Sequence, residues 1–212
     1  MQRLRVAIGL VAVALMAGAA VAGPYDFGDP ETGFIDGTAH DFRGELSDGS
    51  TNTPNNRICQ PCHTPHGAIL NPDGSPVGPL WNQTLSSQTF TRKDWHTGAQ
   101  EDVELGKESK LCLSCHDGTV AIPAYGNQKI TGGAQIGKGG NLSGDHPIGV
   151  NYAEAISSHA FIYENPDDVA DFLSPEGNIE CTSCHHAHGG SDGKFLVTTN
   201  AESQLCRECH RF

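Results

Sequence analysis

The sequence predicts a mostly irregular chain with a few short α-helices and very little sheet. Of its 212 residues, 26 are glycine and 12 are proline, and only 37% are hydrophobic. Glycine and proline interrupt regular elements, and a chain this poor in large apolar side chains has little with which to build a conventional core. Something other than side chains must therefore supply much of the apolar interior.

Four short segments carry helix signals. Residues 108–116 and 201–210 read as helices, and Asn200 is the predicted N-cap of the second. In residues 165–173, a proline at the first helical position and acids in the first turn predict another helix. A further helix is expected over residues 152–159. Alternation of polar and apolar residues is weak throughout, which allows no more than a small hairpin.

All eight cysteines belong to four copies of Cys-x-x-Cys-His. In this spacing, the two thiols form thioethers with a porphyrin and the histidine ligates its iron. The motifs therefore predict four covalently bound c-type haems. The attachment residues are Cys59, Cys62, Cys112, Cys115, Cys181, Cys184, Cys206 and Cys209, and the proximal iron ligands are His63, His116, His185 and His210.

Two other interpretations of the cysteines fit less well. Paired cysteines also bind zinc, but histidine is only 11 of 212 residues, so its presence after all four pairs is not a chance event. A disulfide framework is disfavoured because four tight pairs would cross-link nothing distant. With four porphyrins attached, the haems are expected to form most of the core, wrapped by loops and short helices. Without haem, we expect this chain not to fold.

The second axial ligand of each iron decides between electron transfer and catalysis. Both methionines, Met1 and Met16, lie in a segment expected to be removed, so methionine ligation is excluded. Seven histidines lie outside the motifs, enough to close every iron with a second histidine, and a closed iron cannot bind substrate. They are His40, His66, His96, His146, His159, His186 and His188.

The first 22 residues are typical of a secretory signal. Arg3 and Arg5 precede an apolar run, and Ala20-Val21-Ala22 forms a cleavage site before Gly23. A membrane anchor is the alternative, but the run is shorter than the roughly 20 residues that span a bilayer. No later segment is long and apolar enough to do so. The sequence thus predicts export to the periplasm or the cell exterior, the compartment where c-type haem is attached.

The chain is acidic, with a formal net charge of −12, which becomes −14 without Arg3 and Arg5. Nucleic acid is excluded as a default partner because phosphate backbones need lysine and arginine. The acidity favours solubility outside the cell and also suits docking to basic redox partners.

The motifs alternate in kind, which indicates duplication of a two-haem unit. The first and third motifs are followed by a second histidine and a glycine, at residues 66–67 and 188–189. The second and fourth follow Glu-Ser-x-Leu, at residues 108–111 and 202–205. The predicted units are residues 23–126 and 127–212. Residues 71–98 in the first unit carry turn signals and are interpreted as a loop insertion.

The repeat also suggests the distal ligands. His40 and His146 lie upstream of the first motif of each unit, and His66 and His188 follow it, which supplies two free histidines per unit. His66 and His188 each lie three residues beyond an iron ligand, so a helical turn directs them toward an adjacent haem. Two alternatives stay open in the second unit: His159 in place of His146, and His186 in place of His188.

Several segments, namely residues 58–66, 145–149 and 181–189, resemble secreted multihaem c-type cytochromes of metal-reducing bacteria. In that group, histidines matching His40, His66, His146 and His188 are commonly distal ligands. Some tetrahaem members polymerise into extracellular filaments with a continuous chain of haems. The resemblance implies a core formed by haems and an electron-transfer function.

Two classes of function follow. The first is an electron carrier, either a filament subunit or a soluble shuttle, that exchanges electrons with redox partner proteins or an extracellular acceptor. The second is a multihaem reductase, which needs an open iron and often a motif that departs from Cys-x-x-Cys-His; none of the four departs. The expectation is a carrier without enzymatic activity. A filament also needs a head-to-tail contact that does not close on itself, and residues 23–37, ahead of His40, are a candidate arm for it.

Overall fold

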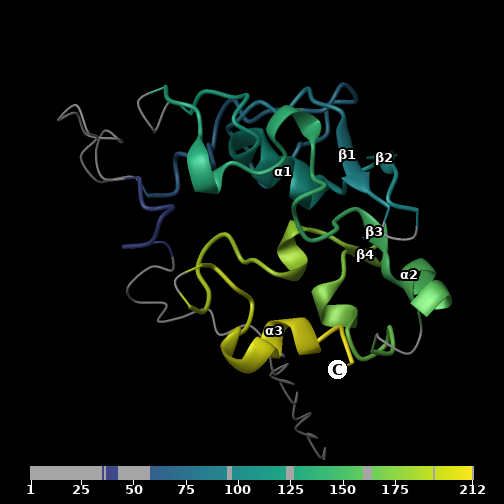
Figure 1. The fold of residues 1–212 in the computed structure, drawn as a ribbon. Coiled ribbons are helices and arrows are strands. Elements are labelled where there is room, and N and C mark those ends of the chain that lie inside the picture. Colours follow the sequence, from purple (N-terminus) through teal and green to yellow (C-terminus); the bar gives the residue numbers. More distant parts are fainter. Residues whose placement is uncertain are drawn as a thin grey trace, which may run out of the picture.

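The computed structural model describes residues 35, 37–42, 58–94, 97–122, 127–159, 164–192 and 194–211. The predicted signal segment, the proposed arm and His96 lie outside these residues, and the side chain of His159 is not described. Short elements joined by long loops make up the described part (Figure 1). Within it, no helix has the length and apolar character needed to cross a membrane.

The helices in the described residues are few and short, and three of these are α-helical: α1 (Lys107–His116), α2 (Tyr152–His159) and α3 (Gln204–Arg207). The rest are single 3-10 turns, namely η3 (Gly132–Ala134), η4 (Lys138–Gly140), η5 (Ala170–Phe172), η6 (Cys181–Ser183) and η7 (Ala201–Ser203). Helices α1 and α2 match the segments expected from the sequence.

The other two expected helices differ from the prediction. The segment from residue 201 breaks into η7 and α3 because Glu202 and Ser203 adopt left-handed backbone angles, with φ of 51° and 61°. Its predicted cap, Asn200, makes no side-chain capping bond. Only η5 forms within residues 165–173. The helical turn ends at Leu173, which is extended, and helical geometry is also disfavoured at the next residue, Ser174, because it precedes Pro175.

Two small antiparallel sheets are present. Strand β1 (Phe90–Lys93) pairs with β2 (Gln100–Val103), and β3 (Val150–Asn151) pairs with β4 (Asn178–Ile179). Strand β1 lies inside the segment interpreted as a loop insertion, so that interpretation is wrong for its last part. Phe90 is buried there and packs against Leu105, Leu113 and Leu142, and this burial outweighs the turn signals around it.

The described core consists of two small hydrophobic clusters. The first contains Phe90, Leu105, Leu113 and Leu142, and it therefore mixes residues of both predicted two-haem units. The second contains Tyr152, Val169 and Ile179. Ile148 packs against both clusters and joins them. The two units thus share apolar contacts instead of burying separate cores.

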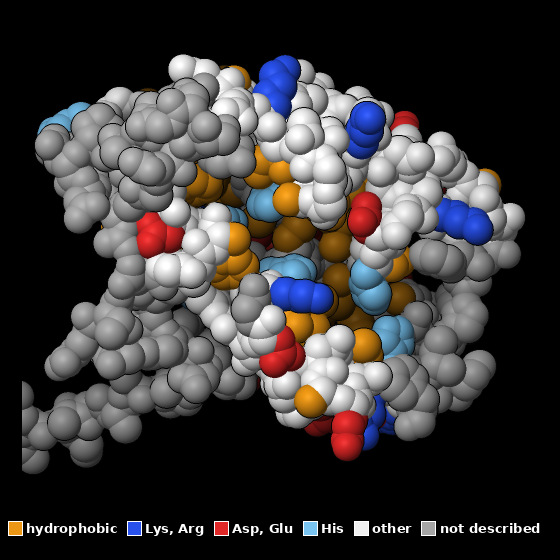
Figure 2. All heavy atoms as spheres, turned by 60° about the vertical axis from the view of Figure 1, so that its left-hand side comes forward, with side chains coloured by type: hydrophobic (Ala, Val, Ile, Leu, Met, Phe, Trp, Pro, Cys, Tyr) orange, Lys and Arg blue, Asp and Glu red, His pale blue; other side chains and the backbone are white. Residues whose placement is uncertain are grey.

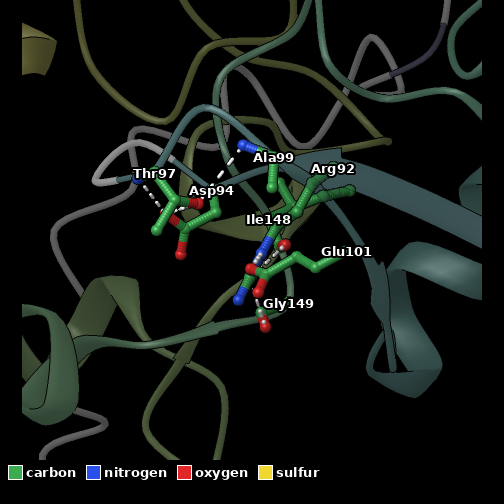
Figure 3. Close-up of polar contacts among 7 residues, drawn as sticks. All are labelled: Arg92, Asp94, Thr97, Ala99, Glu101, Ile148 and Gly149. Carbon is green, nitrogen blue, oxygen red and sulfur yellow. Dashed lines mark hydrogen bonds and ion pairs between the residues drawn. The ribbon is translucent and has the colours of Figure 1, made fainter.

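The hairpin of β1 and β2 holds a segment of the second unit in place (Figure 3). The Arg92 guanidinium donates to the Glu101 carboxylate at 2.8 Å and to the backbone carbonyls of Ile148 and Gly149 at 3.3 and 2.8 Å. Gly149 has a φ of +65°, and a Cβ there would lie 2.5 Å from a methyl carbon of Val103, so only glycine fits. These contacts fix the backbone just after His146.

Candidate haem-attachment centres

Each Cys-x-x-Cys-His motif forms a single helical turn. In the first, third and fourth motifs, the histidine backbone N–H donates to the carbonyl of the first cysteine at 2.9 to 3.0 Å, and the second motif lies within α1. One turn brings the residues at its two ends onto the same side of the backbone. The thiols and imidazole of a motif can therefore meet a single porphyrin.

Backbone carbonyls fix the tautomer of three motif histidines. Nδ1 lies 2.6 Å from the Pro79 carbonyl in His63, 2.8 Å from that of Ala134 in His116, and 3.0 Å from that of Lys194 in His185. A carbonyl oxygen can only accept, so each Nδ1 carries the proton. The lone pair then resides on Nε2, the arrangement typical of imidazoles that ligate metals.

Two predicted distal histidines have the same arrangement. Nδ1 of His40 donates to the Ala187 carbonyl at 2.9 Å, and Nδ1 of His146 donates to the Pro147 carbonyl at 3.1 Å. Burial lowers the pKa of His40, as does the neighbouring His116, although the bond to Ala187 opposes the shift. Burial also lowers the pKa of His188. Both imidazoles thus favour the neutral form that binds metal.

Three motif histidines face a histidine from elsewhere in the chain. Ring centroids are 6.0 Å apart for His63 and His188, 6.1 Å for His116 and His40, and 6.2 Å for His210 and His146. Metal–imidazole bonds of about 2 Å on opposite faces of an iron separate two ring centroids by roughly 6 Å. The spacing of all three pairs therefore suits one iron between the rings.

The remaining motif histidine, His185, has no histidine ring opposite it among the described residues. His66 is exposed and likewise faces no ring in the described part of the chain. His186 lies beside His188, with centroids 5.5 Å apart, and not opposite His185. The possible contributions of His96 and of the His159 side chain fall outside the described residues.

Side chains that were not predicted from the sequence surround two of the pairs. Phe195 stacks on His40 at a centroid distance of 4.4 Å. Trp81 meets His63 edge-on at 6.1 Å, and its indole Nε1 is buried with no hydrogen-bond partner in the described structure. An unmet buried donor costs free energy, and a carboxylate of a bound haem would satisfy it. No motif in the sequence could have identified these residues in advance.

One face of the molecule has a surface hollow. Figure 2 shows histidine and hydrophobic side chains, the latter including cysteine, exposed together within a depression at the middle of the molecular face. Apolar walls with imidazoles suit a porphyrin, which is flat, apolar and bound through its iron. The donor set, the ring spacing, the unmet indole N–H and this hollow together fit haem.

Contacts between thiols link the motifs to one another. The thiols of Cys112 and Cys181 are neighbours, and their interaction raises the pKa of Cys112 and lowers that of Cys181. Burial raises the pKa of Cys62 to about 12, with added repulsion from Cys115 and Cys59. Burial likewise raises the pKa of Cys184, with repulsion from Cys181 and Cys206. Neighbouring motifs along the sequence are thus neighbours in space.

The fourth motif is anchored to the second hydrophobic cluster. The Tyr152 hydroxyl, from the start of α2, donates to the Cys209 carbonyl at 3.0 Å, and that carbonyl also accepts the Glu164 N–H at 2.9 Å. Cys209 packs against the cluster itself. This anchor places His210 opposite His146, whose backbone is held by Arg92 from the other side.

Comparison with protein families finds the model described as Doubled CXXCH motif, which matches residues 175–212. The match contains the third and fourth motifs. No curated protein matches the chain. This part of the chain therefore carries a doubled attachment motif for c-type haem, a cofactor of electron-transfer proteins.

Proposed function

We propose that the protein carries electrons through four c-type haems, each closed by two histidines. The three histidine pairs at 6.0 to 6.2 Å are the observation that carries this proposal. They assign His188 to the first haem, His40 to the second and His146 to the fourth. Bound haem supplies reversible one-electron chemistry. The chain fixes each imidazole through Nδ1 and leaves no coordination position for a substrate at a closed iron.

The repeat predicts the missing ligand of the third haem. In both units, the upstream histidine faces the second iron ligand of its own unit, His40 with His116 and His146 with His210. The histidine after the third motif, His188, instead faces the first motif, one unit earlier. By the same rule, His66 after the first motif serves the third-motif iron of a preceding copy of the chain.

The competing arrangement is closed within one chain, with His66 opposite His185, as the set of four distal histidines suggested from the sequence. The absence of that pair among the described ring contacts favours the open arrangement. An open contact is head-to-tail, so each copy ligates the next and a fibre results. Cys59 and Cys206, in the terminal motifs, are the two exposed cysteines, which also supports haems near both ends.

The function that we propose is therefore an extracellular cytochrome filament subunit, exported by its signal segment and exchanging electrons with redox partners or an extracellular acceptor. The alternative is a soluble periplasmic shuttle with the same four closed irons. A reductase would need one iron that stays open in the assembled protein.

The decisive experiment compares haem-loaded wild type with His66→Ala, with His159→Ala and His186→Ala as matched variants. We expect wild type to form fibres in negative-stain microscopy with all irons low-spin. His66→Ala should remain monomeric, with one of four irons high-spin by electron paramagnetic resonance. A fully low-spin wild-type monomer at every concentration would support the shuttle, and a high-spin iron that binds nitrite in assembled wild type would support the reductase.

A further inference from the structure

A buried carboxylate joins the second motif to the third. Glu180, immediately before Cys181, is 1% exposed, and Ser109 in α1 is 0% exposed. The Ser109 hydroxyl donates to the Glu180 carboxylate and accepts the Cys181 backbone N–H at 2.9 Å. The Gly106 N–H, at the start of α1, donates to the other carboxylate oxygen at 2.9 Å.

The residues around Glu180 leave its side chain little room to move. A Cβ at Gly106 would lie 2.6 Å from the Glu180 carboxylate oxygen, so a larger residue there would displace it. Glu180 also caps η6, because its backbone N–H donates to the Ser183 hydroxyl at 2.9 Å. Helix α1, which ends in the second motif, is thereby locked onto the turn that begins the third.

No cation offsets this carboxylate among the described contacts. Burial raises the pKa of Glu180, the bonds from Ser109 and Gly106 oppose the shift, and Glu108 and Glu176 add to it. The hollow on the solvent side of Gly106 is lined by three acids and one lysine: Glu104, Glu108, Glu176 and Lys107. A buried carboxylate without a cation is expensive for stability alone.

The hydrogen bonds of Ser109 and Glu180 lie beside the cysteines that would attach the second and third haems. Ser109 is one turn before Cys112 on α1, and its hydroxyl accepts the backbone N–H of Cys181, so the thiols of Cys112 and Cys181 are brought close to each other. The remaining proximities follow the sequence: Cys62 with Cys115, and Cys184 with Cys206. These contacts define an order from the first motif to the fourth.

We infer that Ser109 and Glu180 are positioning residues that hold the second and third haems together, making the junction between the units of a single chain of haems in sequence order. The inference rests on the proposed function. Glu180 also adds a charge at that junction. A nearby negative charge favours oxidised iron and lowers the reduction potential. When Glu180 is protonated at low pH, this effect disappears.

The test uses the full haem-loaded protein with Glu180→Gln, Ser109→Ala and the control Ser203→Ala. Ser203 holds the same place before the fourth motif but is exposed. Redox titrations across pH should show two of the four potentials raised in Glu180→Gln at high pH and equal to wild type at low pH. Ser109→Ala should slow electron exchange between haems, measured by pulse radiolysis, and Ser203→Ala should change neither property.

Contacts between haem substituents, measured by nuclear magnetic resonance, test the order itself. Cross-peaks are expected between first and second, second and third, and third and fourth haems. A contact between second and fourth haems with none between second and third, or potentials in Glu180→Gln that match wild type at every pH, would overturn the inference. Intact mass, read together with these contacts, distinguishes failure of the proposed function from failure of this inference. Fewer than four attached haems in wild type contradicts the proposed function, whereas four haems in another order contradicts only this inference.

Discussion

In the two halves of the molecule, the upstream histidines have equivalent contacts, but the histidines that follow the first motif of each half do not. His40 and His146 each face the second iron ligand of their own half, at 6.1 and 6.2 Å. His188 reaches back across the molecule to His63, whereas His66 is exposed. This difference is the one expected of the filament that we propose, in which each unit completes the one before it.

Contacts that support the distal histidines run in both directions between the halves. Arg92, in the β1–β2 hairpin of the first unit, holds the backbone after His146 in the second unit. In return, Ala187 of the second unit accepts the Nδ1 proton of His40. The two predicted units therefore support each other through these contacts, and we expect them to fold together.

The largest difference is expected between removing an internal haem and removing a terminal one. Cys181→Ala/Cys184→Ala removes attachment at the junction, where both neighbouring motifs make contact, and should cost more than about 4 kcal/mol and abolish cooperative unfolding. Cys206→Ala/Cys209→Ala should leave a folded protein with three haems. Intact mass and thermal melts followed by circular dichroism measure both, and equal melts for the two variants would contradict the internal role of the third motif.

His40→Ala and His146→Ala test the likeness of the halves. Each should open one iron of four and produce an equal high-spin signal by electron paramagnetic resonance, because each removes one ring facing a motif histidine. His96→Ala serves as the control and should leave the spectrum unchanged. If His146→Ala left every iron low-spin while His159→Ala opened one, the assignment in the second unit would be wrong.

Arg92→Ala tests the support that crosses between the halves. Loss of its bonds to two backbone carbonyls should destabilise the protein by about 1–3 kcal/mol and raise the high-spin fraction of the fourth haem alone. Arg92→Lys keeps the charge but not the forked geometry, so it should give an intermediate result. An effect on the second haem, whose distal ligand is His40, would show that the hairpin acts on the whole molecule instead.

Trp81→Phe should have the smallest effect. Phenylalanine keeps the aromatic contact with His63 but removes the N–H that we expect to meet a haem carboxylate. The potential of the first haem should fall slightly, because that negative charge loses a donor, and stability should change by about 1 kcal/mol or less. Redox titration measures the shift, and a change in the fourth haem would contradict the assignment.

The sequence was most informative where chemistry imposes spacing. The four motifs, the alternation that implies two units, and the helices at α1 and α2 could all be predicted from residue patterns. The pairing of His188 with His63 could not, because it depends on how the chain returns over itself and not on local periodicity. Nor did the residue pattern indicate the left-handed backbone angles of Glu202 and Ser203, which broke an expected helix.

In the sequence, Ser109 stood out only as part of a repeat with no evident role. Glu-Ser-x-Leu occurs before the second and fourth motifs, but nothing in the pattern identifies Glu180 as the partner of its serine. Arg92 and Trp81 gave no signal either, because one acts through backbone carbonyls and the other through an N–H that has no partner among the described residues.

The packing of α1 against the turn that begins the third motif has a consequence for biogenesis. It brings Cys112 and Cys181 close together, and two neighbouring free thiols are prone to form a disulfide in the oxidising compartment that the signal segment predicts. A chain whose halves closed early would then lose the attachment points of two cofactors at once. If the haems are attached as we propose, thioether formation at the second and third motifs should precede closure, with folding as the last event of maturation.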